Sequence, residues 1–440
     1  MLRAPTPLNS SALLILISTS IIGNSVTGPA PKHPGPSAFQ VTPKRAAALR
    51  KVDQWLRTSA GKVEQPEALA PFFERLYRSG AVEPTGGGAV HILHFGDSHT
   101  AADWWTADLR NLFQHRFGNG GSGFSLAGHP FKGYRRVDAP GGATLSWQSE
   151  GLRAAEGDGY FGLGGVSIST ERAGQSVFLE AECDRIEISY LRHPGGGSLE
   201  LYDRDHLLRQ FSTDGEMAPS FISYQAAPGP HRFVLKTLDS RLVRLFGWIV
   251  DKPGGITYEA LGINGAEASI ILRWNESMLA ADMRRRNPGL IVLAYGTNES
   301  TDSLWKPQSY REMFSSVLRR LHTVAPAASI LVVGPGDRWT HERSVLKVVP
   351  GVDWVIDAQR QACSENGCAF WDLRRRTGGK GVMPDWFTAG LAQPDHAHFT
   401  FEGYKRLASA LFDDLMSKYE TYKKTRLEAN HSHGSTEQNR

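Results

Sequence analysis

Apolar strand-like runs alternate with helical patterns along most of this chain, and this alternation constrains the fold more than any other feature. The runs at 89–95, 290–295, 329–333 and 368–372 are rich in apolar residues, as is typical of strands that are buried on both faces. Apolar residues at helical spacing fill the stretches between them. The pattern predicts an α/β fold whose parallel sheet is covered by helices on both sides.

The alternation is interrupted once, and the interruption has a different pattern. Residues 140–252 contain short strand-like runs separated by Gly/Pro turns such as Ala227-Pro-Gly-Pro230. Several short strands with this punctuation predict an all-β sandwich or jelly roll. We therefore expect an inserted β domain at 140–252, with the α/β domain divided into 44–139 and 253–422.

The two ends of the chain differ in composition from the domains between them. Arg3 is the only charged residue among the first thirty, and it precedes a short apolar core and a run of small residues. Residues 1–28 therefore resemble a secretory signal peptide, with an uncleaved anchor as the alternative. The proline-rich stretch 29–43 is expected to be a linker, and the polar tail 423–440 is expected to be disordered. These features predict an exported, periplasmic or extracellular protein with no transmembrane segment in its mature part.

Charge and cysteine content exclude several classes of function. The formal net charge is +4 over 440 residues, and no basic cluster alternates with aromatic residues, so a nucleic-acid partner is not expected. The three cysteines lack a metal-ligand spacing, so neither a metal nor a zinc site is predicted. Cys363 and Cys368 flank a turn-like sequence and are close enough in the chain for a local disulfide.

Three short polar motifs follow predicted strands or precede the last helix. Gly96-Asp97-Ser98-His99-Thr100 follows the run 89–95, and Gly296-Thr297-Asn298 follows the run 290–295. Asp395-His-Ala-His398 precedes the helix expected from about residue 401. Ligands of open parallel sheets bind beyond the carboxyl ends of the strands, so we expect these motifs to meet there.

The residue types in these motifs suit nucleophilic acyl transfer. Ser98 needs a base to remove its proton, and His398 can supply it while Asp395 orients the imidazole. His396 is a rival base on the same loop. The Ser98 and Gly265 backbone N–H groups and the Asn298 amide can together stabilise an oxyanion. The alternative, without catalysis, is that Ser98 and Asp395 only cap the helices that follow them.

These four segments resemble the blocks of the SGNH (GDSL-like) hydrolases. The first block matches Gly96-Asp97-Ser98, the second Gly265, the third Gly296-Thr297-Asn298 and the last Asp395 to His398. The residue after the nucleophile is His99, where the family consensus has leucine. The resemblance implies a flavodoxin-like three-layer fold, a catalytic triad of Ser98, Asp395 and His398, and no cofactor.

The extended motif Gly-Asp-Ser-His-Thr-Ala-Ala-Asp103 and the place of the insertion resemble one branch of that superfamily, the bacterial peptidoglycan O-acetylesterases. This resemblance implies an exported serine esterase that removes acetyl groups from a polysaccharide through an acetyl-enzyme. The inserted β domain is then expected to resemble a carbohydrate-binding jelly roll. His99 is a candidate substrate contact or a support for the site rather than a base. Trp104 and Trp386 are candidate substrate contacts, because aromatic planes suit sugar faces, and core packing is an equal alternative for Trp386.

Two other functions fit the same residues. An O-acetyltransferase would use the same acyl-enzyme but pass the acetyl group to a sugar hydroxyl. A carbohydrate-binding protein with a vestigial esterase fold would need none of the triad, although Ser98, Asn298, Asp395 and His398 are all present.

Overall fold

A computed structural model of the 440-residue chain describes residues 42–59, 62–80, 89–153 and 157–437. The chain from Thr42 onward forms one compact unit. The expected signal peptide (1–28) and residues 29–41 of the expected linker lie outside the described residues.

The first sheet has six strands in the order β1-β17-β14-β13-β2-β12, all parallel except β1. Without the short edge strand β1, the order of the strands along the chain is 2-1-3-4-5, which is that of flavodoxin-like folds. The expected parallel α/β sheet is confirmed. Its strands are β1 (Val63–Glu64), β2 (Val90–Gly96), β12 (Ile256–Gly262), β13 (Leu290–Ala294), β14 (Ser329–Val333) and β17 (Ala369–Trp371).

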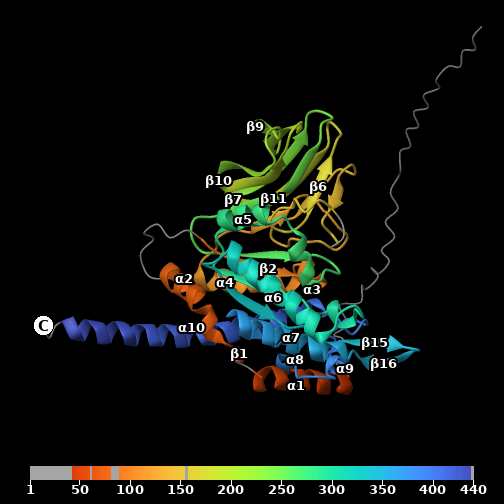
Figure 1. Cartoon of the computed structure of the whole chain (residues 1–440), viewed down its shortest axis with the longest axis vertical. Coiled ribbons are helices and arrows are strands. Elements are labelled where there is room, and N and C mark those ends of the chain that lie inside the picture. The colour runs from red at the N-terminus through yellow and green to blue at the C-terminus, as the bar shows by residue number, and fades with distance from the viewer. Residues whose placement is uncertain (1–41, 60–61, 81–88, 154–156, 438–440) are drawn as a thin grey trace, which may run out of the picture. The chain divides into compact units, whose positions relative to one another are not determined.

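Helices cover both faces of this sheet because its strands carry apolar side chains on alternate sides. Leu93, Phe95 and Leu293 belong to the core shared with α5, α6 and α7. Ile92 and Val292 point the other way, into the core shared with α1, α2, α4, α9 and α10. Figure 1 shows the resulting layers. The helices are α1 (Pro43–Thr58), α2 (Ala70–Gly80), α3 (Ser98–Ala101), α4 (Trp104–Phe117), α5 (Glu276–Arg286), α6 (Pro307–Val324), α7 (Gly351–Asn366), α8 (Leu373–Arg376), α9 (Met383–Thr388) and α10 (Phe401–Glu437), with short 3-10 turns η1 (Pro66–Leu69), η2 (Ala268–Arg273) and η3 (Glu299–Thr301).

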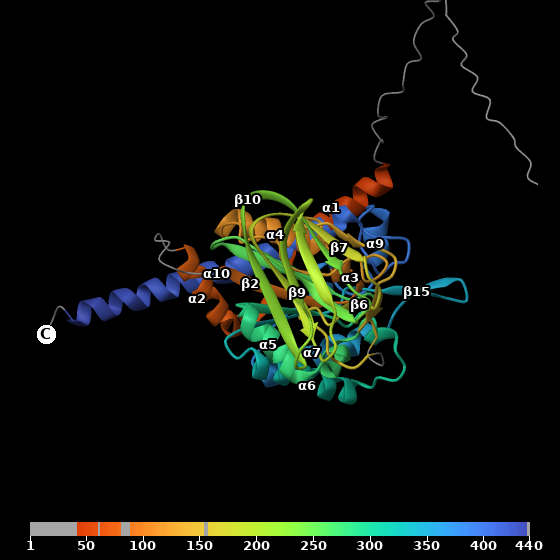
Figure 2. The same ribbon diagram turned by 90° about the horizontal axis from the view of Figure 1, so that it is seen from above.

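The second sheet is antiparallel, has nine strands and lies over the α/β layers, as Figure 2 shows from above. It fits the expected inserted β domain, with its own core around Ile188, Phe233 and Trp248. One strand, β3, precedes the expected start at residue 140 and pairs with β11 through Leu126 and Gly247. The strands are β3 (Gly123–Leu126), β4 (Gly141–Ala143), β5 (Gln148–Glu150), β6 (Ser167–Thr170), β7 (Ser176–Arg192), β8 (Ser198–Asp203), β9 (His206–Ser212), β10 (Ala218–Thr237) and β11 (Val243–Asp251).

The C-terminal tail differs from the disordered segment expected from residue 423. Helix α10 continues to Glu437, and contacts with α2 extend along it. The Arg426 guanidinium donates to both Glu74 carboxylate oxygens at 2.6 and 2.7 Å, and the Tyr422 hydroxyl donates to Glu74 at 2.6 Å. These partners are 348 or more residues apart in the chain, so a local reading of the polar tail does not reveal them.

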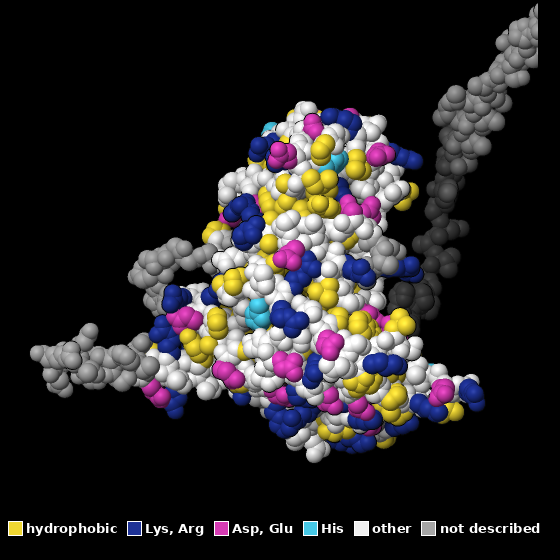
Figure 3. All heavy atoms as spheres, viewed as in Figure 1, with side chains coloured by type: hydrophobic (Ala, Val, Ile, Leu, Met, Phe, Trp, Pro, Cys, Tyr) yellow, Lys and Arg dark blue, Asp and Glu magenta, His cyan; other side chains and the backbone are white. Residues whose placement is uncertain are grey.

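The described surface carries charges of both signs. Figure 3 shows Lys and Arg side chains interspersed with Asp and Glu over one face, rather than gathered into a basic stripe. None of the helices among the described residues combines the length and apolar character that crossing a bilayer requires. Cys363 and Cys368 are buried free thiols, as is Cys183, so the structure does not contain the local disulfide considered from the sequence.

A hairpin made of β15 (Trp339–Glu342) and β16 (Val345–Val348) projects from the α/β domain beside the segment that precedes α10. The Trp339 N–H donates to the His396 carbonyl at 3.0 Å, which joins the base of the hairpin to the loop that carries Asp395 and His398. The hairpin thus helps to position that loop.

His94 is buried in β2, between β12 and β13, so its protonation is linked to folding. Its Nδ1 lies 2.8 Å from the Tyr258 hydroxyl, and burial lowers its pKa to about 3. The folded state keeps the ring neutral while the unfolded chain binds a proton below about pH 6.5. The stability contributed by the neutral ring is therefore lost as the pH falls from about 6.5 toward 3.

We expect the free energy of unfolding of the wild type to fall between pH 7 and pH 5 by about 2 kcal/mol more than that of His94→Gln. Urea titrations at the two pH values measure this difference. His206→Gln, which changes an exposed histidine on β9, is the control and should retain the wild-type pH dependence. If the free energy of unfolding fell equally in the wild type and in His94→Gln, protonation of His94 would not be linked to stability.

Candidate active site

Three of the sequence motifs emerge side by side because β2 is paired with β12 on one side and β13 on the other. Gly96 at the end of β2 lies opposite Gly262 and Ala294. A Cβ on Gly96 would come within 2.3 Å of the Thr100 Oγ1 and 2.9 Å of the Ala294 carbonyl oxygen. Only glycine therefore fits where the chain turns from β2 into α3, the short helix that begins at Ser98.

Gly262 fits closely against the same helix. A Cβ at this position would lie 2.3 Å from the Ala101 nitrogen and 2.7 Å from the Asp97 carbonyl oxygen. The Ile263 N–H donates to the Gly96 carbonyl at 3.0 Å and continues the strand pairing into the loop. The loop that carries Gly265 is thereby held beside the start of α3.

A continuous hydrogen-bonded relay joins Ser98, His398 and Asp395. Ser98 Oγ lies 2.7 Å from His398 Nε2, and His398 Nδ1 lies 2.6 Å from Asp395 Oδ2. The ionised carboxylate can only accept, so Nδ1 carries the proton and Nε2 accepts from the Ser98 hydroxyl. The structure therefore brings together three residues spread over 300 positions.

The Asp395 loop is held by its own backbone. Asp395 Oδ1 accepts the N–H groups of Ala397 and His398, both at 3.0 Å. Partial burial opposes ionisation of Asp395, but the hydrogen bonds from the His398 ring and these two amides outweigh it and hold its pKa well below the usual range. An anionic carboxylate at this point stabilises an imidazolium on His398.

The three expected oxyanion donors lie around the carboxyl ends of β2, β12 and β13. Gly265 is exposed and has a φ of 74°, and a Cβ built at this position would have no neighbouring atom within 4 Å. Asn298 Nδ2 donates one hydrogen to the Ala266 carbonyl at 2.9 Å, which fixes the amide beside the Gly265 turn and leaves its second N–H available. The Ser98 N–H starts α3, where helix amides have no intrahelical acceptor.

Glu299 ties two of these loops together, a role that the sequence analysis did not assign. Its Oε2 accepts the Gly296 N–H at 2.9 Å and its Oε1 accepts the Ala268 N–H at 3.0 Å. Burial raises the pKa of Glu299 to about 8, partly offset by the Ala268 amide. One side chain thus spaces the Gly265 and Asn298 loops. In the sequence, only the position of Glu299 directly after Asn298 indicated a role at the site.

His99 packs against His398, the base that the sequence predicts. The two ring centroids lie 4.8 Å apart, and His99 Nδ1 lies 2.7 Å from the Tyr404 hydroxyl. Burial, with the neighbouring His398, lowers the pKa of His99 well below its usual value. His99 therefore stays neutral and supports the face of the His398 ring. The rival base His396 is 8% exposed and packs on Phe387.

Arg338 is a second residue that the sequence analysis missed. It lies in the loop after β14, donates to the Thr297 carbonyl, and lies close enough to Asp97 and Asp395 for both to act on its charge. Burial dominates and lowers its pKa. Its position beyond the carboxyl end of a parallel strand could have marked it as a site residue, because ligand-binding loops gather at that edge.

The two candidate tryptophans lie in different environments. Trp104 is half-buried, with the Tyr404 ring against it at 5.9 Å and the Arg135 guanidinium 5.9 Å from its ring centroid. Trp386 is completely buried, packs edge-on against Phe399 and donates its ring N–H to the Thr377 carbonyl at 3.0 Å. The expected sugar contact of Trp386 is therefore wrong, because neither face of its ring reaches the surface.

Comparison with known families decides what kind of domain this geometry belongs to. Residues 226–406 match the model of the GDSL-like lipase/acylhydrolase family. The chain carries a GDSL-like acylhydrolase domain. The matched stretch contains Gly265, Asn298, Asp395 and His398, and it begins after Ser98. The protein is accordingly a carboxylic ester hydrolase.

Solved structures extend the likeness to most of the chain. A structure described as "Peptidoglycan O-acetylesterase in action" matches with 26% identity and a TM-score of 0.69, over 80% of this chain and 96% of that one. A family two carbohydrate esterase from Clostridium thermocellum matches with 12% identity and a TM-score of 0.30, over 62% of this chain and 98% of that one. No curated protein shows significant sequence similarity. Over most of its length the chain is therefore similar in fold to an O-acetylesterase.

We expect Glu299→Ala to lower kcat for ester hydrolysis by about ten- to a hundredfold, because the Gly265 and Asn298 loops lose their shared acceptor. KM should change less. Kinetics on an aryl acetate measure both constants. The matched control is Glu267→Gln, whose half-buried carboxylate accepts from Trp305 instead of the two loops. A Glu299→Ala variant with wild-type kcat would show that the loops keep their spacing without it.

Proposed function

We propose that this protein is an exported serine esterase that hydrolyses O-acetyl groups on peptidoglycan. The observation that carries the mechanism is the relay from Ser98 Oγ through His398 to Asp395, with contacts of 2.7 and 2.6 Å. The likeness to a peptidoglycan O-acetylesterase supports the substrate class. The signal-like residues 1–28 support export.

Ser98 attacks the acetyl carbonyl while His398 Nε2 accepts its proton. The Ser98 Oγ–carbon bond forms, and the bond to the sugar oxygen breaks as His398 returns the proton to the departing alkoxide. Asp395 keeps Nδ1 protonated and offsets the positive charge that His398 carries between these events. Water then attacks the acetyl carbon while His398 takes its proton. The Ser98 Oγ–carbon bond breaks, the proton passes to Ser98 Oγ, and acetate leaves.

The oxyanion formed in both steps lies among the Ser98 and Gly265 N–H groups and the free N–H of Asn298. Preorganised donors act on charge that develops in the transition state, so each is worth about 2.7–4 kcal/mol. Their spacing is set by groups outside the reaction, chiefly the Glu299 carboxylate. The fold therefore supplies stabilisation without reorganising at the moment of attack.

We expect Ser98→Ala and His398→Ala each to lower kcat by about 10³- to 10⁴-fold or more, because the nucleophile and its base act as one unit. Release of p-nitrophenol from p-nitrophenyl acetate measures the loss. His396→Asn is the matched control on the same loop, since asparagine tolerates the left-handed φ of 53° at that position. Loss of activity in His396→Asn with retention in His398→Ala would assign the base to His396.

The substrate assignment is tested by acetate release from O-acetylated peptidoglycan and from acetylated xylan. We expect the wild type to release acetate faster from peptidoglycan, and Ser98→Ala to release it from neither. Faster release from xylan would contradict the peptidoglycan assignment. Appearance of new acetyl groups on an added glycan, in place of free acetate, would instead assign the acetyl-enzyme to a transferase.

A further inference from the structure

The loop at 127–140, which joins β3 to β4, forms one wall beside the candidate active site. The Arg135 N–H donates to the carbonyl of Ala101, the last residue of α3, at 3.3 Å. Asn264, the neighbour of Gly265, donates its side-chain N–H to the Lys132 carbonyl at 2.8 Å. The loop therefore contacts both the nucleophile helix and the Gly265 turn.

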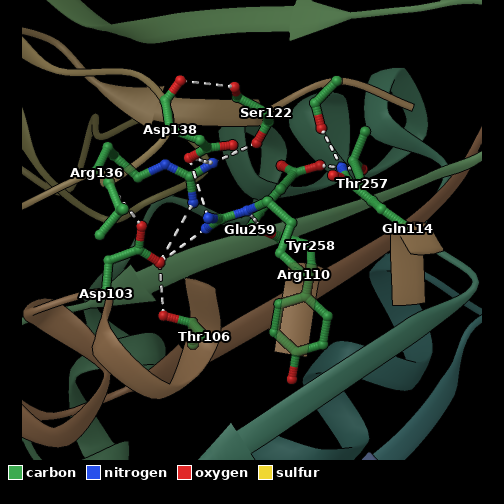
Figure 4. Close-up of polar contacts among 12 residues, drawn as sticks. Asp103, Thr106, Arg110, Gln114, Ser122, Arg136, Asp138, Thr257, Tyr258 and Glu259 are labelled. Atoms are coloured by element: carbon green, nitrogen blue, oxygen red, sulfur yellow. Dashed lines mark hydrogen bonds and ion pairs between the residues drawn. The ribbon is translucent and has the colours of Figure 1, made fainter. Parts of the chain in front are cut away.

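A buried ion-pair network holds this loop in place (Figure 4). Arg110 pairs with Asp103 at 2.7 Å and with Asp138 at 3.0 Å, and Arg136 donates to the Ser122 carbonyl. The Arg110, Asp103 and Arg136 side chains are at most 1% exposed. Breaking such a network leaves a charge buried without a partner, which is costly. The loop is thus fixed relative to α3 and α4.

Successive residues near the end of this loop alternate between buried and exposed. Tyr134 and Arg136 are buried, whereas Arg135 is exposed and Val137 is 59% exposed. Among the described residues Arg135 has no carboxylate partner; its guanidinium lies 5.9 Å from the Trp104 ring centroid. The loop therefore presents a free cation and an apolar side chain to solvent next to the active site.

A recess of about 270 Å³ opens at these two residues, between the loop and the second sheet. Arg135, Val137, His129 and Tyr134 contribute to its lining, together with Leu126 and Leu179 from the sheet. The exposed His129 packs edge-on against Tyr134, with ring centroids 6.3 Å apart. The recess combines apolar walls, aromatic edges and one unpaired guanidinium, which is the combination a sugar bearing a carboxylate requires.

Side chains in contact connect the recess to the triad. From Arg135 the series runs through Trp104 and Tyr404 to His99, whose ring lies against His398. Tyr404 in this series is buried, so the contacts place the recess close to the candidate active site through packed side chains.

We propose that the recess at 127–140 is a binding subsite for a carboxylate-bearing sugar of the same glycan whose acetyl group lies at Ser98. Arg135 pairs with the carboxylate, and Val137 and His129 contact the sugar body. This inference rests on the proposed function, because the subsite acts on the same glycan. The carboxylate belongs either to the sugar itself or to a peptide attached to it, and the two sources share the same chemistry at Arg135.

The test compares KM values of the full chain for soluble O-acetylated peptidoglycan fragments before and after their carboxylates are converted to amides. We expect Arg135→Gln to raise KM for the carboxylated fragments about tenfold, since it removes a charge-assisted pair. The amidated fragments should show the same high KM with the wild type and with Arg135→Gln. Fragments without stem peptides assign the carboxylate to the sugar if the effect persists and to the peptide if it disappears.

The matched control is Arg209→Gln, which removes the same charge from an exposed position on β9 and should leave KM unchanged. Val137→Asp is the second variant, and its added negative charge should also raise KM for carboxylated fragments only. Equal KM values for carboxylated fragments in the wild type, Arg135→Gln and Val137→Asp, all folded by circular dichroism, would overturn the subsite.

Binding to Ser98→Ala separates this inference from the proposed function. Calorimetric titration with the carboxylated fragments should show weaker binding when Arg135→Gln is added to Ser98→Ala. If the wild type released no acetate but this difference remained, the esterase assignment would fail and the subsite would stand. If acetate release depended on Ser98 but neither binding nor KM depended on Arg135, the subsite would fail alone.

Discussion

The parallel pairing of β2 with both β12 and β13 is the constraint on which the rest of the structure depends. Gly96 is aligned with Gly262 on one side and Ala294 on the other, so the three loops that follow these strands begin at one level. The order of the strands reverses between β2 and β13, and loops diverge at such a point to leave a crevice. Ser98, Gly265 and Asn298 reach that crevice from separate strands, and the loop before α10 adds His398.

Much of this arrangement could be predicted because the chemistry lies on short segments directly after strands. An apolar run fixes where a strand ends, and Ser98 and Asn298 follow their strands after two and four residues. The alternation of strands and helices likewise predicts the confirmed parallel sheet. The proximity of His398 to Ser98 followed from the family resemblance together with the sheet-edge rule, since 300 residues separate the two in the chain.

The rest depended on contacts that no local pattern contains. Whether Trp386 faces a sugar or the core is decided by how α9 packs on Phe399, and the helical tail depends on the pairing of Arg426 with Glu74. In the sequence, Arg338 and Glu299 look like ordinary charged loop residues. Only the fold shows that Arg338 lies beside Thr297 and that Glu299 lies between the Gly265 and Asn298 loops. The pairing of Arg110 with Asp138 joins α4 to the segment before β4, and sequence spacing gives no reason to connect them.

The second sheet is inserted between α4 and β12, and its two connections lie side by side, because the Gly120 N–H donates to the Ile256 carbonyl and the Ile256 N–H donates to the Gly118 carbonyl. A module attached by one flexible tether samples many orientations, whereas this one is anchored at two adjacent points and braced by the Arg110 pairs. Any polymer held by the inserted sheet is consequently presented to the serine at a fixed offset. If the substrate is a repeating polymer, as we propose, this fixed offset would select which of its positions reaches Ser98.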